Sequence, residues 1–508
     1  MCPNGLKWPI WSFRNTNRLI KYHFLVNAME GDKPFGEGHA EAEIHRTAQP
    51  STVVHWTAPN GRVFKTIVPP TVYPPREDTS LLASVFNNAR FHAGADVLEI
   101  GCGSGVLSLY AATFGCKITA CDVNPLAVAS TRALLQNHGY AASVLEGGPG
   151  PAIDGGLDQW AGDRLYDVVL WNTPYLSSSV LDQGALGPME EAALTDTDHE
   201  GLVFRFYDLL SKGRLIHSGG VAFLTVSSEG CLESAEAGAW HRGLAARRIK
   251  QTVFENGEEL SVLAVWHPYT SAPLVELKST TSTNDEVLAM SSKPGTSVRA
   301  LHQTMGRGRR GNNWMNQTEG LMASWQIRSG SKLVHNTMDQ LRIGRSLVRY
   351  IRHLIPIDDD VCLKWPNDVY LKTPKNGPKK AGGVLFEAVS RGAQHQLVLG
   401  IGLNLLNEED TAFASLEMVG VRRSVSELHT SVHAMVASLF EALEGVAESV
   451  VDIEAVSREV NQGIRSLGGH FYREKSASFI GLDSSGNLLF SEQEKPVVNP
   501  EELRWSNI

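Results

Sequence analysis

Residues 97–105 read Val-Leu-Glu-Ile-Gly-Cys-Gly-Ser-Gly, an apolar run that leads directly into three glycines at alternate positions. The run predicts a buried strand, and the glycines predict a tight turn before a helix, where the backbone can approach a bound nucleoside closely. The same pattern is compatible with a dinucleotide site or with a plain tight turn. The stretch therefore predicts an α/β fold with a candidate ligand site at the end of a strand.

Further apolar runs follow this stretch at regular intervals. Residues 117–121, 166–171, 220–226 and 261–266 are predicted strands, and residues 125–138 are a predicted helix with its apolar side chains near one face. Strands that alternate with helices predict a doubly wound, mostly parallel sheet.

Two polar features lie at the ends of these strands. Asp122 ends the second strand, where a carboxylate can accept hydrogen bonds from both hydroxyls of a ribose. Residues 167–175 read Asp-Val-Val-Leu-Trp-Asn-Thr-Pro-Tyr, which is a strand that ends in an Asn-x-Pro-Tyr tetrad. The tetrad and Asp122 together argue against a dinucleotide ligand.

This combination resembles the class I S-adenosylmethionine-dependent methyltransferases, and more narrowly the branch whose Asn-Pro-Pro-Tyr motif methylates planar nitrogen. Members of that branch act on glutamine amides of release factors, and related motifs act on adenine in DNA. Residues 72–79, Val-Tyr-Pro-Pro-Arg-Glu-Asp-Thr, also resemble the segment before the core in the release-factor type. The resemblance implies a Rossmann-like domain that binds S-adenosylmethionine through Thr79, Glu99, Gly101, Gly103, Gly105, Asp122 and Asn172.

The resemblance also implies an acceptor site at Asn172, Pro174 and Tyr175, in which the Asn172 carbonyl orients the acceptor NH₂ and acts catalytically by positioning. Thr173 stands where the branch has its first proline. Because proline fixes φ, we expect a looser turn here. The expected acceptor is a glutamine or asparagine amide of an unidentified protein. The alternatives are a module that binds S-adenosylmethionine or an acceptor protein without catalysis, and an enzyme that methylates nucleic acid.

A second informative stretch is residues 303–314, Gln-Thr-Met-Gly-Arg-Gly-Arg-Arg-Gly-Asn-Asn-Trp. The glycines allow the backbone to fold tightly around a ligand, and the arginines supply forked donors for carboxylate or phosphate. By itself the stretch fits equally well an arm that binds nucleic acid.

The motifs around this stretch decide between the two interpretations. They are Ser-Thr-Thr-Ser-Thr-Asn-Asp at 279–285, Lys-Trp-Pro-Asn-Asp-Val-Tyr at 364–370, Lys-Ala-Gly-Gly-Val-Leu-Phe-Glu at 380–387 and Gly-Ile-Gly-Leu-Asn at 400–404. In this order they resemble the catalytic domain of biotin–protein ligases, over residues 274–508. The resemblance implies that biotin and ATP form biotinyl-5′-AMP and that biotin then passes to a lysine of a biotin carboxyl-carrier protein. Lipoate ligases share the fold, but their loops lack the Gly-Arg-Gly-Arg-Arg-Gly run.

The resemblance assigns roles at this site. Ser282, Thr283, Asn284 and Gln303 line the biotin head, and Gly306–Gly311 close over the adenylate. Arg309 retains the intermediate, Lys380 stabilises charge at the reacting carboxylate, and Asp368 helps to place Mg²⁺. The whole biotin and ATP site is carried over onto Ser282, Thr283, Asn284, Gln303, Gly306, Arg307, Gly308, Arg309, Arg310, Gly311, Trp314, Lys364, Asn367, Asp368, Lys380 and Asn404. Asn312 departs from the family, in which many members carry another arginine.

These resemblances divide the chain into five segments. They are an N-terminal extension at 1–50, a methyltransferase-like domain at 51–267, a linker at 268–273, a ligase catalytic domain at 274–465 and an SH3-like β-barrel module at 466–508. Residues 1–29 contain four basic and no acidic residues, a composition compatible with an organelle transit peptide, an unstructured extension or translation from Met29. Without transit, we expect a cytoplasmic protein.

Composition bounds the partners of the 508-residue chain. The charged fraction is 20% and the net charge is −9, which gives no global signature of nucleic-acid binding. The six cysteines form no Cys-x-x-Cys pair, and no apolar run is long enough for a membrane span. Some biotin ligases carry an N-terminal DNA-binding domain, but the methyltransferase-like domain takes that position, so we expect no operator binding. Dimerisation is common in the ligase family and leaves a homodimer open.

Overall fold

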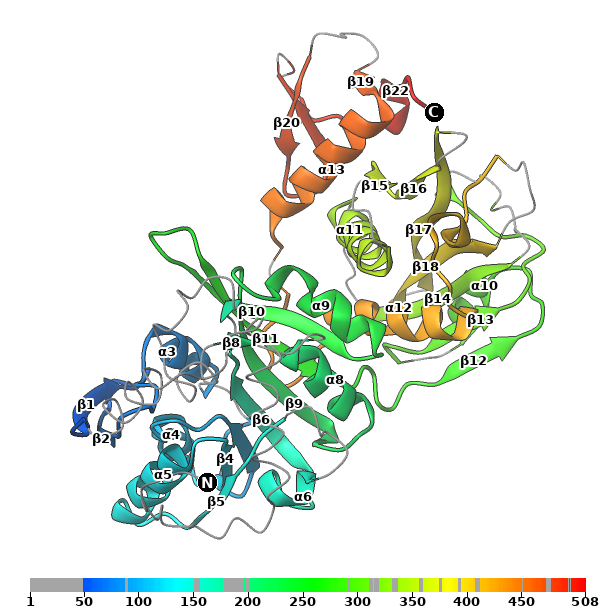
Figure 1. Cartoon of the computed structure of the whole chain (residues 1–508). Coiled ribbons are helices and arrows are strands. Elements are labelled where there is room, and N and C mark those ends of the chain that lie inside the picture. The colour runs from blue at the N-terminus through cyan, green and yellow to red at the C-terminus, as the bar shows by residue number, and fades with distance from the viewer. Residues whose placement is uncertain are drawn as a thin grey trace, which may run out of the picture.

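The computed structural model describes residues 49–86, 90–149, 156–174, 176–177, 195–196, 201–290, 293–309, 314, 319–330, 337–355, 360–373, 377–391, 394–406, 412–449, 451–471, 477–491, 493 and 495–508. Two seven-stranded sheets form the centres of two domains, and short paired strands end the chain (Figure 1). We call β1 to β11 the first domain, β12 to α13 the second domain and β19 to β22 the C-terminal module. Residues 1–29, whose composition is compatible with a transit peptide, and Tyr175 lie outside the described residues.

The first domain has a largely parallel sheet of order β10-β11-β9-β6-β3-β4-β5, which confirms the doubly wound prediction. Its strands are β3 Asp96–Ile100, β4 Lys117–Asp122, β5 Ala142–Glu146, β6 Tyr166–Asn172, β9 Ile216–Ser227, β10 Ala245–Val253 and β11 Glu259–Trp266. From β9 to β5 neighbouring strands run parallel, whereas β11 pairs antiparallel with both β9 and β10. The carboxyl ends of β9, β6, β3 and β4 therefore lie side by side at one edge of the sheet.

Helices and a hairpin surround this sheet. The helices are α3 Glu77–Ala83, α4 Val106–Ala112, α5 Pro125–Asn137, α6 Leu157–Trp160, α8 Leu202–Ser211 and α9 Leu232–His241, and the short strands are β1 Thr52–Thr57, β2 Val63–Val68, β7 Leu176–Ser177 and β8 Thr195–Asp196. The predicted helix α5 begins at Pro125 because Asn124 accepts a hydrogen bond from the Leu126 N–H and proline suits the first helical position.

The second domain is built on a mainly antiparallel sheet of order β12-β13-β14-β18-β17-β16-β15. Its strands are β12 Leu274–Leu277, β13 Ser297–Ala300, β14 Glu319–Gly330, β15 Val361–Lys364, β16 Asp368–Thr373, β17 Gly377–Arg391 and β18 Gln394–Leu406, and its helices are α10 Thr283–Ala289, α11 Thr337–Leu354, α12 Val425–Phe440 and α13 Ile453–Leu467. Helix α11 buries an apolar face that includes Leu341, Leu347 and Ile351.

The C-terminal module consists of two antiparallel strand pairs among the described residues. Strand β19 Gly469–Phe471 pairs with β22 Leu503–Trp505, and β20 Phe479–Leu482 pairs with β21 Leu488–Phe490. A turn at Asp483–Asn487 joins β20 to β21, with the Asp483 carboxylate accepting hydrogen bonds from the Ser485 and Asn487 N–H groups.

The two domains share one buried core. Helix α9 and strand β10 of the first domain pack against α11 and α12 of the second. Trp240 and Trp266 belong to the same apolar cluster as Val432 and Val436. The expected linker is packed as well, since Tyr269 is 7% exposed and its N–H lies 3.0 Å from a carboxylate oxygen of Glu441.

Acidification from pH 6.5 to 4 is expected to destabilise the protein through His433 on α12. The Trp325 Nε1–H donates to His433 Nδ1 at 3.0 Å, so that nitrogen must be unprotonated. Burial lowers the pKa of His433 from 6.5 to about 4. Because this pKa is lower in the folded state than in the unfolded chain, neutral His433 contributes its full stabilisation above pH 6.5, and this stabilisation is lost as the pH falls toward 4. The loss is at most about 1.4 kcal/mol per pH unit.

Urea unfolding between pH 4 and 7 measures this dependence. We expect His433→Asn to flatten the curve in that window, whereas His55→Gln, at an exposed position on β1, should leave its slope unchanged. Equal slopes for wild type and His433→Asn would contradict the assignment.

Candidate active sites

The first candidate site lies where β3, β4 and β6 end. These strands are neighbours in the sheet, so their register brings together the glycine turn after Ile100, Asp122 at the end of β4 and Asn172 at the end of β6. In doubly wound sheets ligands bind at the carboxyl ends of the strands. Three motifs that lie far apart in the sequence thus meet at one edge.

The glycine turn is shaped for close approach. Gly101, Gly103 and Gly105 all have positive φ, at 67°, 47° and 79°. A Cβ on Gly105 would lie 2.7 Å from the Thr131 Oγ1, whereas one on Gly101 would meet nothing closer than 3.7 Å. Gly105 therefore serves the packing of the turn on α5, and Gly101 leaves room above the strand.

Two carboxyl groups flank the turn, that of the buried Glu99 and that of the half-buried Asp122. The Gly103 and Asn124 N–H groups donate to the two oxygens of Asp122 at 2.9 and 2.8 Å. The remaining lone pairs of Asp122 suit two ribose hydroxyls, as the sequence predicted. Burial raises the pKa of Asp122, and it raises the pKa of Glu99 to about 8, so Glu99 is largely protonated at neutral pH.

Asn172 is held from two sides. Its Nδ2 donates to the Asp78 Oδ2 at 3.1 Å, and its Oδ1 accepts a hydrogen bond from the Thr225 hydroxyl. Asp78 also accepts from the Thr79 N–H at 2.6 Å, which brings the predicted Thr79 to the same place. Because a carboxylate only accepts, these contacts fix which end of the Asn172 amide faces Asp78.

Thr173, where the absence of proline predicted a looser turn, is hydrogen-bonded to the neighbouring strand β9. Its N–H donates to the Thr225 Oγ1 at 3.2 Å, and its hydroxyl donates to the Thr225 carbonyl oxygen at 2.5 Å. Thr173 is 2% exposed, and Pro174 is also buried. Two hydrogen bonds to strand β9 thus constrain the position where the methyltransferase branch has a proline.

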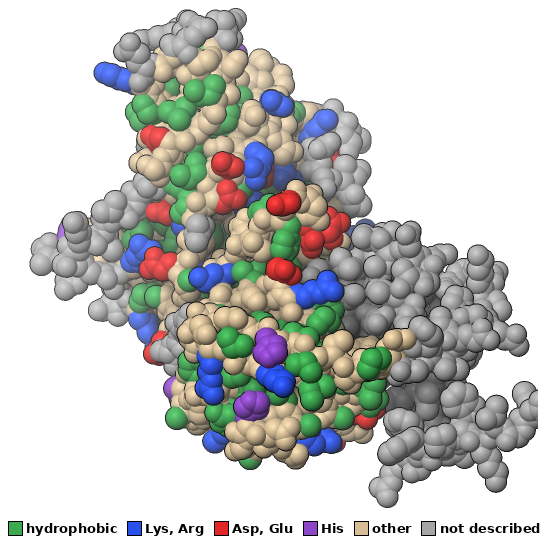
Figure 2. Space-filling model, turned by 90° about the vertical axis from the view of Figure 1, so that its left-hand side faces the viewer, with side chains coloured by type: hydrophobic (Ala, Val, Ile, Leu, Met, Phe, Trp, Pro, Cys, Tyr) green, Lys and Arg blue, Asp and Glu red, His purple; other side chains and the backbone are tan. Residues whose placement is uncertain are grey.

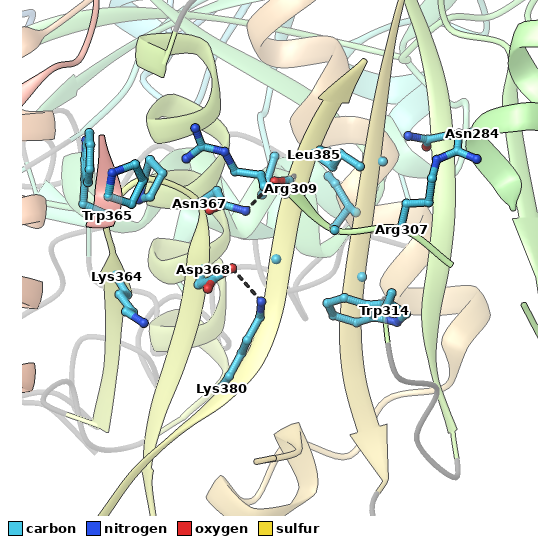
Figure 3. A pocket seen from close by; sticks show the side chains of 18 of the residues that line it. Asn284, Arg307, Arg309, Trp314, Lys364, Trp365, Asn367, Asp368, Lys380 and Leu385 are labelled. Carbon is cyan, nitrogen blue, oxygen red and sulfur yellow. Dashed lines mark hydrogen bonds and ion pairs between the residues drawn. The ribbon is translucent and has the colours of Figure 1, made fainter. Parts of the chain in front are cut away.

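The second candidate site is a cavity of about 410 Å³ above the sheet of the second domain (Figure 3). Its size is within the range of small-molecule sites. It is lined by twelve of the predicted residues: Ser282, Thr283, Asn284, Gln303, Arg307, Gly308, Arg309, Trp314, Lys364, Asn367, Asp368 and Lys380. Gly400 and Gly402 line it as well, so the order of the strands gathers all five sequence motifs around one space.

At one end of the cavity, buried polar groups surround the start of α10. The Gln303 Oε1 accepts from the Thr283 N–H at 2.7 Å, and the Thr283 and Ser324 hydroxyls lie 2.7 Å apart. Asn284 accepts from Ser324 and donates to Glu387. This end of the cavity can therefore both donate to and accept from a small polar ligand.

The two described arginines of the loop lie at different places (Figure 3). Arg307 extends toward Asn284 and forms a two-pronged ion pair with Asp285, both distances being 2.7 Å, while its NH2 lies 3.2 Å from Glu387. These carboxylates raise the pKa of Arg307, and Arg307 lowers that of Asp285. Arg309 lies beside Asn367, and its charge faces the other end of the cavity.

That other end is cationic and aromatic. The Lys380 Nζ lies 2.7 Å from the Asp368 Oδ1 and 5.7 Å from the centroid of the Trp314 ring. The Lys364 Nζ lies 5.3 Å from the ring centroids of both Tyr370 and Trp505, and burial lowers its pKa. The arrangement suits an anionic ligand attached to a planar ring.

Some predicted residues are placed elsewhere. Asn404 does not line the cavity, and its Nδ2 donates to the Ala414 carbonyl oxygen at 3.0 Å. Gly306 lies beside the cavity, where its carbonyl accepts from the Trp314 N–H at 2.8 Å. Arg310, Gly311 and Asn312 lie outside the described residues.

The C-terminal module also contributes to the cavity, which the sequence did not predict. Arg504 and Trp505 of β22 line the cavity together with Lys364. They come from a segment more than one hundred residues further along, and no motif marks them. Glu387, by contrast, ends the quoted 380–387 motif and could have been paired with Arg307 by charge.

The folds and sites define a chain of two enzyme domains, a methyltransferase-like α/β domain followed by a biotin-ligase-like domain. Residues 76–201 match the family model "Methyltransferase small domain", and residues 274–404 match the model "Biotin/lipoate A/B protein ligase family". The chain is thus a fusion of these two domain types.

Individual relatives divide in the same way. The bifunctional ligase/repressor BirA of Escherichia coli (strain K12) is 26% identical over 39% of this chain and 63% of its own length. The release factor glutamine methyltransferase of Geobacter sulfurreducens is 28% identical over 27% of this chain and 47% of its own length. The chain thus spans less than two thirds of either relative. A solved biotin protein ligase from Aquifex aeolicus, in complex with biotin and ATP, is 23% identical with a TM-score of 0.35 and covers 46% of this chain and 95% of its own.

Two features are absent from the described residues, a membrane-spanning helix and a metal-binding cluster. No helix in this part of the chain combines the length and the apolar character that a bilayer crossing requires. No three His, Cys, Asp or Glu side chains in it are grouped as they would be around a metal ion.

Proposed function

We propose that the second domain activates biotin with ATP and transfers it to a lysine of a biotin carboxyl-carrier domain. The observation that carries this proposal is the single cavity, which joins hydrogen-bonding groups at one end to Arg309, Lys364 and Lys380 at the other. Biotinyl-5′-AMP has the same division, since its polar ureido ring lies at one end of the molecule and its acyl phosphate and adenosine lie toward the other.

The reaction has two steps. A carboxylate oxygen of biotin attacks the α-phosphorus of ATP, a new O–P bond forms, and pyrophosphate leaves. The lysine amine then attacks the acyl carbon, so that an amide bond forms, AMP leaves and a proton is released. Arg309 and Lys380 would stabilise the negative charge that develops in both steps.

The residues of the cavity fit these ligands. Thr283, Asn284 and Gln303 would hold the ureido group, and Trp314 would pack on the adenine. Lys364 would face the phosphates as a point charge. Any Mg²⁺ would neutralise the triphosphate. Because the Asp368 carboxylate is paired with Lys380, we propose that such an ion takes most of its ligands from phosphate and water.

Incubation with biotin, [α-³²P]ATP, Mg²⁺ and a biotin carboxyl-carrier domain tests the ligase proposal. We expect a labelled acyl-adenylate, pyrophosphate release and biotin on the acceptor lysine. Parallel reactions with lipoate and octanoate test the choice of acid, and we expect little product from either. Absence of both adenylate and acceptor labelling would contradict the proposal.

We propose that the first domain methylates a glutamine or asparagine amide of a protein. Support comes from the adjacency of the glycine turn, Asp122 and Asn172 at the ends of three neighbouring strands. S-adenosylmethionine supplies an electrophilic methyl group when bound, so the acceptor nitrogen would gain an N–C bond while the S–CH₃ bond breaks, S-adenosylhomocysteine leaves and one N–H proton is released. The Asn172 carbonyl would accept one N–H of the acceptor and so direct the nitrogen toward that methyl group, with Pro174 and Tyr175 completing the site.

Asn172→Ala is expected to lower the rate of methyl transfer about 100-fold, because it removes the side-chain carbonyl oxygen that would accept a hydrogen bond from the substrate amide and orient it. The measurement is transfer of tritium from labelled S-adenosylmethionine to cellular protein. Asn137→Ala, at an exposed position near the end of α5, should retain activity, and the ligase reaction of the same chain reports on folding. Equal activity of Asn172→Ala and wild type would remove Asn172 from the mechanism.

Two other outcomes of that experiment distinguish the alternatives. Binding of S-adenosylmethionine without transfer to any acceptor would indicate a binding module. Tritium in RNA or DNA would indicate a nucleic-acid methyltransferase. On the face shown in Figure 2, acidic side chains are interspersed with basic ones, whereas phosphate binding favours a continuous basic surface.

A further inference from the structure

We propose that Thr225 is a positioning residue of the methyl-transfer site and that it holds both the Asn172 carbonyl and the turn at Thr173. The inference rests on the proposed methyl transfer by the first domain, because it concerns how the acceptor-binding amide is oriented. Thr225 itself would contact neither donor nor acceptor.

The placement of Thr225 follows from strand register. Strands β6 and β9 are parallel neighbours, and Thr225 is the register partner of Asn172. Side chains at paired positions of adjacent strands lie on the same face of a sheet. Thr225 is completely buried, and the four residues that precede it in β9, Val221 to Leu224, are apolar and also completely buried. A hydroxyl at such a position needs hydrogen-bond partners.

The hydrogen bonds around Thr225 form a network in which the donor and the acceptor of each bond are determined. The Thr173 N–H can only donate, so the Thr225 Oγ1 accepts from it, at 3.2 Å. The Thr225 hydroxyl proton is then free to be donated to the Asn172 Oδ1. The Thr173 hydroxyl donates in turn to the Thr225 carbonyl oxygen, at 2.5 Å. Each donor in this network has one acceptor, so the rotation of the Thr225 hydroxyl is fixed.

The consequence is a fixed amide at Asn172. Asp78, 3% exposed, takes the NH₂ end of the amide, and Thr225 takes one lone pair of the carbonyl end. A carbonyl oxygen has two lone pairs, so one remains for the N–H of an acceptor. Turning the amide by 180° would place its NH₂ group against the Thr225 hydroxyl and its oxygen against the Asp78 carboxylate. The network therefore presents an acceptor oxygen to the substrate before the substrate arrives.

The same hydrogen-bond network explains why the turn can have threonine at position 173. A proline there has no N–H, so the contact to the Thr225 Oγ1 would not exist. In this protein the turn is constrained by a pair of threonines that bond to each other across two strands. Rigidity at this turn thus comes from the neighbouring strand and not from a pyrrolidine ring.

The test compares Thr225→Val, which keeps the shape and removes the hydroxyl, with Thr225→Ser, which keeps the hydroxyl. We expect Thr225→Val to lower kcat for methyl transfer about 10- to 100-fold and Thr225→Ser to remain within about threefold of wild type. The affinity for S-adenosylmethionine and the biotin-adenylation rate of the same chain should stay within about twofold in both variants. If Thr225→Val fails to fold, Thr225→Ala takes its place under the same criteria.

A kcat for Thr225→Val equal to wild type, or an equal loss in Thr225→Val and Thr225→Ser, would overturn the proposal. If the wild-type chain transfers no methyl group to protein or nucleic acid, the proposed function fails, and crystal structures of wild type and Thr225→Val decide the question of positioning. A turned or displaced Asn172 amide in the variant supports the role of Thr225. An Asn172 side chain in its wild-type position overturns it.

Discussion

Lys380→Met is expected to lower the rate of acyl-adenylate formation about 100- to 1,000-fold. Lys380 lines the cavity, with its Nζ 2.7 Å from Asp368 and next to the face of Trp314. Methionine retains much of the apolar stem but removes the charge that would stabilise the reacting carboxylate and phosphate. It also leaves Asp368 facing the triphosphate without its cation. Release of pyrophosphate and appearance of labelled adenylate measure the effect.

Lys379 provides the matched control for this prediction. It precedes Lys380 on β17 and does not line the cavity, so Lys379→Met should stay within about twofold of wild type. Similar losses in the two variants would mean that general charge, and not the position of Lys380, determines the rate. Full activity of Lys380→Met would refute its proposed role.

Arg247→Leu is expected to lower the free energy of unfolding by about 4 kcal/mol. Arg247 on β10 is 2% exposed and reaches from the first domain to the end of α12 in the second. Its guanidinium donates to the carbonyl oxygens of Ala437, Ser438, Glu441 and Ala447, at 3.3, 2.8, 2.7 and 2.9 Å. The last carbonyls of a helix have no partner within the helix, so Arg247 serves as a cap supplied by the other domain.

Thermal and urea unfolding followed by tryptophan fluorescence measure this effect. Arg247→Lys should be intermediate, because an ammonium group cannot reach four acceptors with the geometry of a guanidinium fork. The adjacent Arg248 is the control. Its ion pair with Glu259, at 2.6 Å, is partly exposed, so Arg248→Leu should cost no more than about 1 kcal/mol. Equal stability of Arg247→Leu and wild type would show that the two domains do not depend on this contact.

Local sequence predicted much of the fold and of both sites. The strand before Gly101 and the helix from Pro125 follow from apolar periodicity and turn chemistry, which act between near neighbours in the chain. Within motifs such as 364–370 and 380–387 the relative positions of the residues are set locally, since each motif is a single turn or strand segment. Twelve residues assigned from such motifs line one cavity, and it is the order of the strands that brings the separate motifs together there.

Contacts between distant segments could not be read in this way. Arg307 was assigned to the ligand, but in the structure it is paired with Asp285 and Glu387. Arg504 reaches the cavity only because the C-terminal module folds back onto it. These arrangements depend on how separate elements pack, and periodicity in one element carries no information about its partner.

The sequence by itself determined that this chain joins a doubly wound domain with a glycine turn to a second domain with an Arg/Gly loop, because those patterns are local and chemically specific. Only the tertiary structure decided that the two domains share a core and that Arg247 caps α12 across it. It also decided that Thr173 is hydrogen-bonded to strand β9. The reason is strand register, because the pairing of β6 with β9 places Thr225 beside Asn172. Thr225, more than fifty positions further along the sequence, then accepts a hydrogen bond from the Thr173 N–H, a group that proline lacks, and donates one to Asn172.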